Sequence, residues 1–166
     1  MSERILIAGI GNIFLGDDAF GCEVVKKLSF RSWPDGVRVE DFGIRGYDLA
    51  FALMDDCDLA ILVDAVPRGQ APGTVYLIEP DDLDDHSQTF DAHSMDPVKV
   101  LALTRSLGGT LPRVVIIGCE PAFTGVEGEG HMGLSEPVAA SIDTACELIE
   151  TVLVRELTVK SAQLAA

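Results

Sequence analysis

Residues 4–21 read RILIAGIGNIFLGDDAFG, and this stretch decides the fold class. Residues 4–10 are a short, nearly continuous apolar run, which indicates a strand that is buried on both faces. A glycine-containing loop follows, and residues 18–30 then place Cys22, Val25 and Leu28 at helical spacing. A buried strand that leads through a glycine-containing loop into a helix is typical of an α/β protein with a parallel sheet.

The rest of the chain continues this alternation of apolar runs and amphipathic stretches. We expect further strands at 37–42, 59–66, 74–78 and 113–119, and helices at 47–54, from Asp96-Pro97 to Gly108-Gly109, and after a capping Ser135. The link 67–73 is too short for a parallel crossover, so strand 74–78 should run antiparallel to the strand before it. The pattern predicts a three-layer α/β sandwich, in which a twisted, five-stranded, mostly parallel sheet with one antiparallel strand carries helices on both faces. We expect residues 1–158 to form a single domain and 159–166 to be a frayed tail.

Composition narrows the class of partner and the compartment. The 166 residues include 12 Lys and Arg against 27 Asp and Glu, a formal net charge of −15, which disfavours binding to nucleic acid or to an anionic membrane. No apolar run reaches the roughly 20 residues of a spanning helix, and no signal peptide is evident. The 4 cysteines are widely spaced without a C-x-x-C pair, which excludes a zinc knuckle and suits reduced thiols. We therefore expect a cytoplasmic protein.

The loop after the first strand carries two adjacent acids, Asp17 and Asp18. A dinucleotide fingerprint G-x-G-x-x-G fails here because Phe14 stands at the third glycine position, and the two acids would repel a pyrophosphate at the helix N-terminus. One acid could simply cap the following helix. A second acid beside it favours a site that faces a cation, and the sequence leaves both interpretations open.

Two further residues fall at the same expected edge of the sheet. Asp64 lies near the end of the apolar strand 59–66, where a carboxylate is costly unless it is paired or bound to a cation. A structural partner such as a backbone amide or an arginine would also satisfy it. His93 lies just before the helix that begins at Asp96-Pro97, and a lone histidine in a loop is more often solvated than a ligand. Carboxylates and an imidazole together suit Zn, Ni, Mn or Fe, and three protein ligands would leave a coordination position open.

Several motifs together resemble the [NiFe]-hydrogenase maturation endopeptidases. In chain order they are GIGNIFLGDDAFG (9–21), DFGIRGYDL (41–49), ILVDAV (61–66), the His93 segment, GCEP (118–121) and GLS (133–135). The resemblance covers nearly the whole chain. It implies a twisted five-stranded sheet between helices and a hydrolase that removes the C-terminal extension of a hydrogenase large-subunit precursor after nickel insertion.

The resemblance also implies the site residues. The metal-binding and catalytic positions of the family fall on Asp18, Asp64 and His93. In the family these residues are thought to recognise nickel that the substrate already holds, so the nickel is supplied by the large subunit and no permanent organic cofactor is expected. The expected partner is the precursor, and peptide-bond hydrolysis would use a water activated by the nickel or by a carboxylate.

Supporting positions come from the first two motifs. Asp17 and Asp41 are candidates for water activation or for shaping the loops, and Gly43 and Gly46 for close approach of the substrate backbone. The second motif departs from the family at Phe42 and Ile44, where glycine and threonine are frequent.

Two alternative functions remain open at this point. One is a peptidase of the same fold with another substrate, for which the loops 79–91 and 127–133 would set the choice. The other is a non-catalytic nucleotide- or flavin-binding module of flavodoxin type.

Overall fold

The computed structural model describes residues 2–55, 57–82, 95–126 and 128–166. Strands and helices alternate along the chain in the predicted order. The elements are β1 (Ile5–Ile10), η1 (Gly16–Ala19), α1 (Phe20–Leu28), β2 (Val37–Gly43), α2 (Gly46–Met54), β3 (Leu59–Ala65), β4 (Val75–Ile78), η2 (Pro80–Asp82), α3 (Pro97–Ser106), β5 (Arg113–Cys119) and α4 (Glu136–Leu164).

One five-stranded sheet has the order β2-β1-β3-β5-β4. The pairs β1–β2, β1–β3 and β3–β5 are parallel, and β4 runs antiparallel to β5. The predicted fold class, with its single antiparallel strand, is confirmed. The short link before β4 returns the chain along the far side of β5, so β4 pairs with β5 and forms one edge of the sheet.

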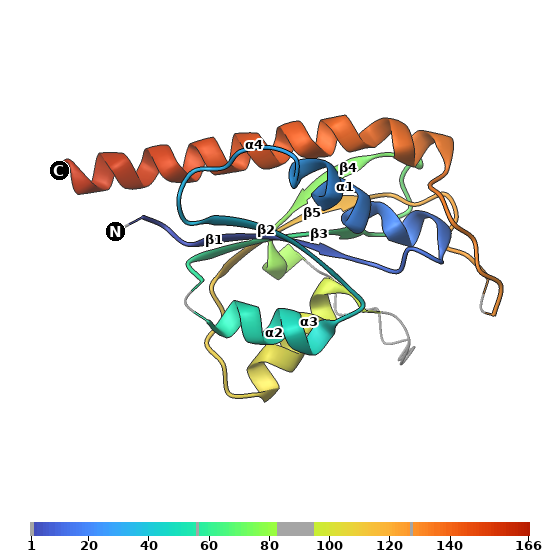
Figure 1. The fold of residues 1–166 in the computed structure, drawn as a ribbon, viewed down its shortest axis with the longest axis horizontal. Helices are drawn as coiled ribbons and strands as arrows, with labels where there is room; N and C mark the ends of the chain where they lie inside the picture. The colour runs from blue at the N-terminus through green and yellow to red at the C-terminus, as the bar shows by residue number, and fades with distance from the viewer. Residues whose placement is uncertain (1, 56, 83–94, 127) are drawn as a thin grey trace.

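The helices form the two outer layers (Figure 1): α1 and α4 cover one face of the sheet, and α2 and α3 cover the other. A hydrophobic core lies on each face of the sheet, and the strands contribute side chains to both because successive side chains point to opposite faces. Thus Ile5 and Ile7 pack under α1 and α4, whereas Leu6, Ala8 and Ile10 pack against the α2 and α3 side. Burial on both faces explains why β1 is almost wholly apolar in sequence.

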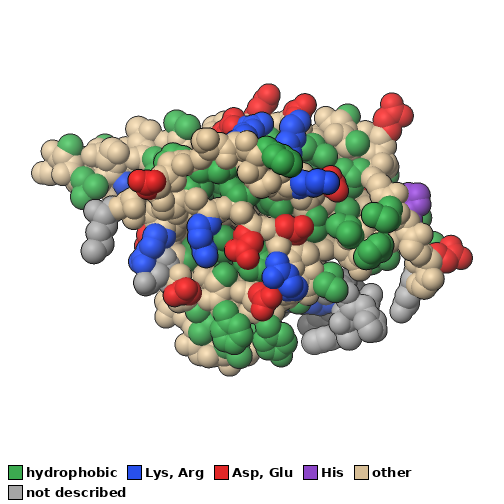
Figure 2. All heavy atoms as spheres, viewed as in Figure 1, with side chains coloured by type: hydrophobic (Ala, Val, Ile, Leu, Met, Phe, Trp, Pro, Cys, Tyr) green, Lys and Arg blue, Asp and Glu red, His purple; other side chains and the backbone are tan. Residues whose placement is uncertain are grey.

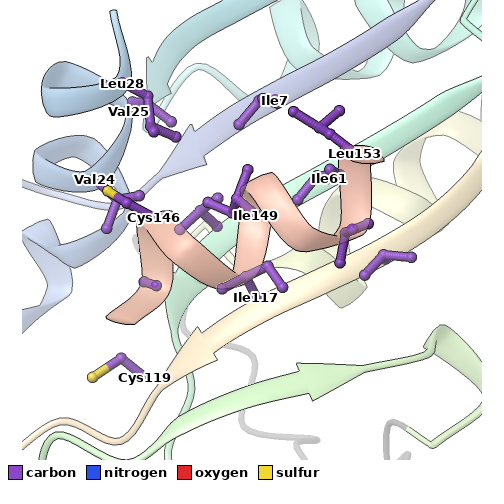
Figure 3. Close-up of a cluster of buried hydrophobic side chains, with 14 of the residues drawn as sticks. Ile7, Val24, Val25, Leu28, Ile61, Ile117, Cys119, Cys146, Ile149 and Leu153 are labelled. Atoms are coloured by element: carbon purple, nitrogen blue, oxygen red, sulfur yellow. The ribbon is translucent and has the colours of Figure 1, made fainter. Parts of the chain in front are cut away.

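The final helix contributes a continuous apolar stripe to the larger core. Figure 3 shows Cys146, Ile149 and Leu153 of α4 directed toward the sheet, where Ile7 and Ile117 lie. The predicted face of this helix is confirmed at Val138, Ala145, Ile149 and Val152, which are buried, and at Ile142, which packs against the same cluster. All 4 cysteines are free, and Cys22, Cys119 and Cys146 are buried, as expected for reduced core thiols.

Two glycines allow α1 to sit unusually close to the sheet. A Cβ on Gly21 would lie 2.0 Å from the Val63 carbonyl oxygen, and one on Gly11, where φ is 141°, would lie 1.8 Å from the Asp18 carbonyl oxygen. Neither position has space for a side chain. The glycines of the first motif therefore bring the loop after β1 and the start of α1 down onto the ends of β1 and β3.

Details of the helix ends differ from the prediction. The helix expected from residue 18 begins as the 3₁₀ turn η1 and becomes α-helical at Phe20. Ser135 occupies the N-cap position of α4, but its side chain makes no capping hydrogen bond because Asp17 accepts from its hydroxyl instead. The expected tail, 159–166, is helical as far as Leu164, with Lys160 Nζ 2.8 Å from Glu3 Oε1; its fraying in solution stays a prediction.

Candidate active site

The candidate site lies beyond the carboxyl ends of β1 and β3. The chain leaves β1 through α1 to reach β2 on one side, and returns through α2 to reach β3 on the other side. Because α1 and α2 cover opposite faces, this reversal is a switch point, and doubly wound sheets bind ligands in the crevice expected there. In Figure 1 this end of the sheet lies on the right.

Asp64 lies near the end of β3 and is 1% exposed. One carboxylate oxygen accepts a hydrogen bond of 2.8 Å from the Ala65 amide. Burial raises the pKa of Asp64 well above its usual value, and the nearby carboxylates of Asp18 and Asp96 raise it further. No ion pair to Asp64 is present within the described part of the chain, so its charge is stabilised by one backbone amide alone.

Asp18 is half-buried in η1 and faces the same crevice as Asp64. Its Oδ2 accepts a hydrogen bond of 2.9 Å from the Asn12 amide. Burial raises the pKa of Asp18 against the effect of this hydrogen bond, and the charge of Asp96 adds to the rise. Neither η1 nor α1 has a side-chain cap, so the capping interpretation of the acid pair is wrong.

Asp17 points the other way and is fully buried. Its Oδ2 accepts from the amides of Ala122 and Phe123 and from the Ser135 hydroxyl, at 2.8–2.9 Å, and its Oδ1 accepts from the Ser135 amide at 2.7 Å. Burial would raise the pKa of Asp17, but these hydrogen bonds outweigh it and lower the pKa below its usual value. Asp17 thus joins three segments: the first motif, the loop after β5 and the start of α4.

Asp41 stands exposed at the end of β2, and its Oδ1 accepts from the Gly43 amide at 2.9 Å. It lies beside the buried Cys22, whose thiol donates to the Gly11 carbonyl at 3.5 Å. Burial raises the pKa of the Cys22 thiol, with further contributions from Asp41, Asp64 and Asp18. Cys22 is therefore a neutral thiol surrounded by acids.

The two candidate glycines have different surroundings. Gly43 has a φ of 54°, and the nearest atom to a Cβ there would be the Gly11 carbonyl oxygen at 3.6 Å, so it leaves open space beside the loop. Gly46 is buried, and a Cβ would lie 2.0 Å from Cε of Met95. In the structure, the close approach that Gly46 permits is therefore that of Met95.

Sequence reasoning assigned Asp96 only a capping role, which is confirmed by a hydrogen bond of 2.9 Å from the Lys99 amide to its Oδ1. The structure adds that its carboxylate lies close enough to Asp18 and Asp64 to raise the pKa of both. This placement brings a third acid to the crevice. Nothing in the sequence indicates this placement, because capping of α3 is enough to explain an aspartate at position 96.

Glu120 of the GCEP motif was also missed. It is 6% exposed and accepts hydrogen bonds from the Tyr76 hydroxyl and the Arg68 amide, both at 2.7 Å, and from the Gly69 amide at 3.1 Å. Burial alone would raise the pKa of Glu120, but these donors lower it below its usual value. Glu120 therefore fixes the loop between β3 and β4. The signal was an acid directly after an apolar strand, as at Asp64.

His93 lies outside the described residues, so the expected set of Asp18, Asp64 and His93 stays a prediction. Within the described ranges, which omit 83–94, no three His, Cys, Asp or Glu side chains form a group that could hold a metal ion. The structure brings together two of the three expected residues. Also within those ranges, no helix has both the length and the apolar character needed to cross a bilayer.

A buried and a half-buried aspartate lie at the switch point of this doubly wound α/β sheet, where their negative charge disfavours a phosphate ligand. The family model for hydrogenase maturation proteases matches residues 22–152. The chain belongs to this family of peptidases, and the flavodoxin-type alternative is therefore not supported.

Individual relatives agree with this family. A Methanocaldococcus jannaschii protein, provisionally named a hydrogenase maturation protease, is 40% identical over 150 residues, which cover 89% of this chain and 94% of the relative. The hydrogenase 2 maturation protease of Escherichia coli is 32% identical, with 88% of each chain covered. The solved structure of the Escherichia coli hydrogenase maturating endopeptidase HybD superposes with a TM-score of 0.75 over 92% of this chain and 93% of that one, at 29% identity.

Proposed function

We propose that this protein removes the C-terminal extension of a [NiFe]-hydrogenase large-subunit precursor after nickel insertion, and that nickel held by the precursor is the recognition element. Membership of the maturation protease family supports hydrolysis of a hydrogenase precursor in general. Four free cysteines support a reducing compartment, in line with processing in the cytoplasm.

The observation that carries the proposal is the state of Asp64. A carboxylate that is 1% exposed, beside Asp18 and without an ion pair in the described part of the chain, is electrostatically unsatisfied. A cation placed between the two acids would relieve both the burial and the repulsion. Nickel brought by the substrate is such a cation, and oxygen and imidazole ligands suit it.

In this proposal Asp18, Asp64 and His93 contact the nickel of the precursor. His93 precedes Asp96 by three residues in the sequence, and Asp96 lies near both acids, which supports a histidine reaching the same crevice. These contacts would fix the scissile bond relative to the cleft, and positioning of this kind contributes several kcal/mol to lowering a barrier. The attacking water would be activated by the nickel or by one of the carboxylates.

Asp17 and Asp41 have different roles in this proposal. Asp17 accepts four hydrogen bonds from the loop after β5 and from Ser135, so we assign it to loop organisation. Asp41 is exposed at the mouth of the cleft, where a substrate segment would pass.

The test is cleavage of a purified, nickel-loaded precursor, read as loss of mass at its C-terminus. We expect the wild-type chain to process this precursor and to leave the nickel-free precursor intact. Asp64→Asn should abolish processing, because it removes the charge that faces the cation, while the side chain can still accept from the Ala65 amide. Glu147→Gln, an exposed change on α4, is the matched control. Normal cleavage by Asp64→Asn would contradict the assignment.

A further inference from the structure

The two acids of the crevice belong to separate elements. Asp18 is in η1, and Asp64 is near the end of β3. The charge of Asp18 raises the pKa of Asp64, so the two carboxylates repel one another when both are ionised. The loops around the two acids must therefore hold them together against this repulsion.

Asp64 lies where β3 extends past the end of one neighbouring strand. The ladder between β1 and β3 ends at the pair Gly9 and Val63, whereas the ladder between β3 and β5 continues to Ala65 and Cys119. The Ala65 amide donates to the Asp64 carboxylate at 2.8 Å. The position of this carboxylate therefore depends on the path that the chain takes just beyond β3, which is held from the β5 side.

Glu120, directly after β5, holds that path. Its Oε2 accepts from the Arg68 amide and the Tyr76 hydroxyl, both at 2.7 Å, and its Oε1 accepts from the Gly69 amide at 3.1 Å. The Arg68 guanidinium lies over the Tyr76 ring, 5.4 Å from its centroid, and adds a second contact between the link and β4. The donors offset the cost of burying the carboxylate, so Glu120 fixes the chain a few residues beyond Asp64.

The next residues of the same loop hold the turn that carries Asp18. Asp17 Oδ2 accepts from the amides of Ala122 and Phe123, at 2.8 and 2.9 Å, and the Asp17 amide donates to the Phe123 carbonyl at 2.7 Å. A Cβ on Gly16 would lie 2.7 Å from that same carbonyl oxygen, so the turn lies directly against the loop. Because Asp18 follows Asp17 in η1, its position is set from this loop.

Residues 120–123 therefore touch both acidic elements, and we call them the β5 bracket. Glu120 joins its first residue to the chain beyond β3, and Asp17 joins its last two residues to η1. At the outer end, the rings of Phe123 and His131 meet edge to face, with their centroids 5.2 Å apart. His131 is the one histidine in the described part of the chain, and Figure 2 shows it in purple at the right-hand end of the molecule. The bracket is thus packed along its length.

We propose that the β5 bracket sets the spacing of Asp18 and Asp64 against their mutual repulsion, with Glu120 and Asp17 as its positioning residues. Both act through the two crevice acids rather than by contact with the substrate. This inference rests on the proposed function, which places the nickel of the precursor between those acids. With the spacing preformed, arrival of the nickel requires no rearrangement of η1 or β3.

The unbound protein provides the first test. The amides of Asn12 and Ala65 donate to Asp18 and Asp64, so their ¹H–¹⁵N chemical shifts report where the two carboxylates lie. Glu120→Gln keeps the size of the side chain but turns one acceptor oxygen into an NH₂ group that faces donors. We expect both amide signals to shift in this variant, because the bracket connects them. A shift of the Ala65 signal alone would show a purely local tie and overturn the inference.

Processing kinetics provide the second test. Glu120→Gln and Asp17→Asn should each lower kcat/KM for the nickel-loaded precursor about tenfold, as displacement of positioned groups does. Because both residues act through one bracket, the double variant should also lose about tenfold, whereas two independent losses would multiply to about a hundredfold. Wild-type kinetics in either single variant, or multiplied losses in the double variant, would contradict the bracket.

Leu153→Ala is the control that separates positioning from general stability. Leu153 is buried in the core between α4 and the sheet, where Figure 3 shows it beside Ile61, and its truncation lowers the melting temperature. At a temperature where every variant is folded, Leu153→Ala should keep the wild-type kcat/KM and the wild-type signals of Asn12 and Ala65. An equal loss of kcat/KM in Leu153→Ala would mean that the bracket variants act through stability, and the inference would fail.

These outcomes separate the two proposals. A wild-type chain that leaves the nickel-loaded precursor intact would overturn the proposed function, while the amide signals, which need no precursor, would still decide whether the bracket holds the two acids. Cleavage by the wild type together with a Glu120→Gln shift confined to Ala65 would overturn this inference alone.

Discussion

Two buried aspartates of this molecule differ in their hydrogen bonds and in the direction of their pKa shifts. Asp17 and Asp64 are 0% and 1% exposed. Asp17 accepts four hydrogen bonds, and its pKa is lowered; Asp64 accepts one and has acids beside it, and its pKa is raised. The first carboxylate stabilises the folded state in its charged form, whereas the second is costly in that form unless a cation arrives.

Asp64→Asn should therefore stabilise the unbound protein at neutral pH. A raised pKa means that the folded state holds the proton of Asp64 more tightly than the unfolded state, so the wild type loses stability as the pH rises from the ordinary carboxyl pKa through the raised one. The gain in melting temperature for Asp64→Asn should grow over this interval and then level off, at roughly 2–4 °C for each 1 kcal/mol. Thermal unfolding at pH 4, 6 and 8 measures it.

The matched control for this measurement is Glu147→Gln, which should leave the melting temperature unchanged. The contributions of Asp17 and Glu120, whose lowered pKa values make the protein less stable on acidification, are common to wild type and variant and cancel in the comparison. A melting temperature of Asp64→Asn below that of the wild type at pH 8 would show that the Asp64 charge is already balanced.

At the scale of elements, the site is made by the fit of α1 onto the ends of β1 and β3. Gly21 has backbone oxygens around its missing side chain, those of Val63 at 2.0 Å and Ile10 at 2.4 Å from an added Cβ. Because these are backbone atoms, no side-chain rotation can relieve a clash. The close fit keeps η1, and with it Asp18, against the end of β3, where Asp64 lies.

Gly21→Ala should push α1 away from the sheet. Overpacking of this kind costs about 1–3 kcal/mol, and a clash with backbone places the expected loss of unfolding free energy at the upper end of that range. Chemical denaturation measures the loss, with Gly130→Ala as the control, since nothing lies within 4 Å of a Cβ at Gly130. Equal stability of the two variants would contradict the close packing of α1.

At the scale of the whole molecule, the net charge of −15 is spread over a single 166-residue chain. Such an excess destabilises the compact state through self-repulsion and favours positively charged partners. Part of this charge lies at the crevice, where Asp96 is near enough to Asp18 and Asp64 to raise the pKa of both.

The melting temperature of the isolated protein should consequently rise with salt. The Debye length falls from about 30 Å at 0.01 M to about 8 Å at 0.15 M, so added salt screens the repulsion between distant acids. Thermal unfolding in sodium chloride from 0.01 to 0.15 M measures the effect, and potassium chloride should give the same increase. A melting temperature that falls over this range would mean that ion pairs such as Arg31–Glu150 outweigh the repulsion.

The sequence by itself determined the strand and helix order, the single antiparallel strand and the edge of the sheet at which Asp18 and Asp64 lie near one another. These follow from local patterns: apolar runs, helical spacing and the short link 67–73. It also indicated Asp64, because an acid in an apolar strand end is informative wherever the chain goes.

Only the tertiary structure decided which surroundings, and therefore which role, each acid has. Asp17 and Asp18 are neighbours in the chain, yet one is held by Ser135 and the loop after β5 while the other faces Asp64. Partners more than 100 residues away, as Ser135 is from Asp17, leave no local pattern. The roles of Asp96 and Glu120 were hidden for the same reason: a side chain's charge state depends on what folding places around it, and no sequence spacing encodes that environment.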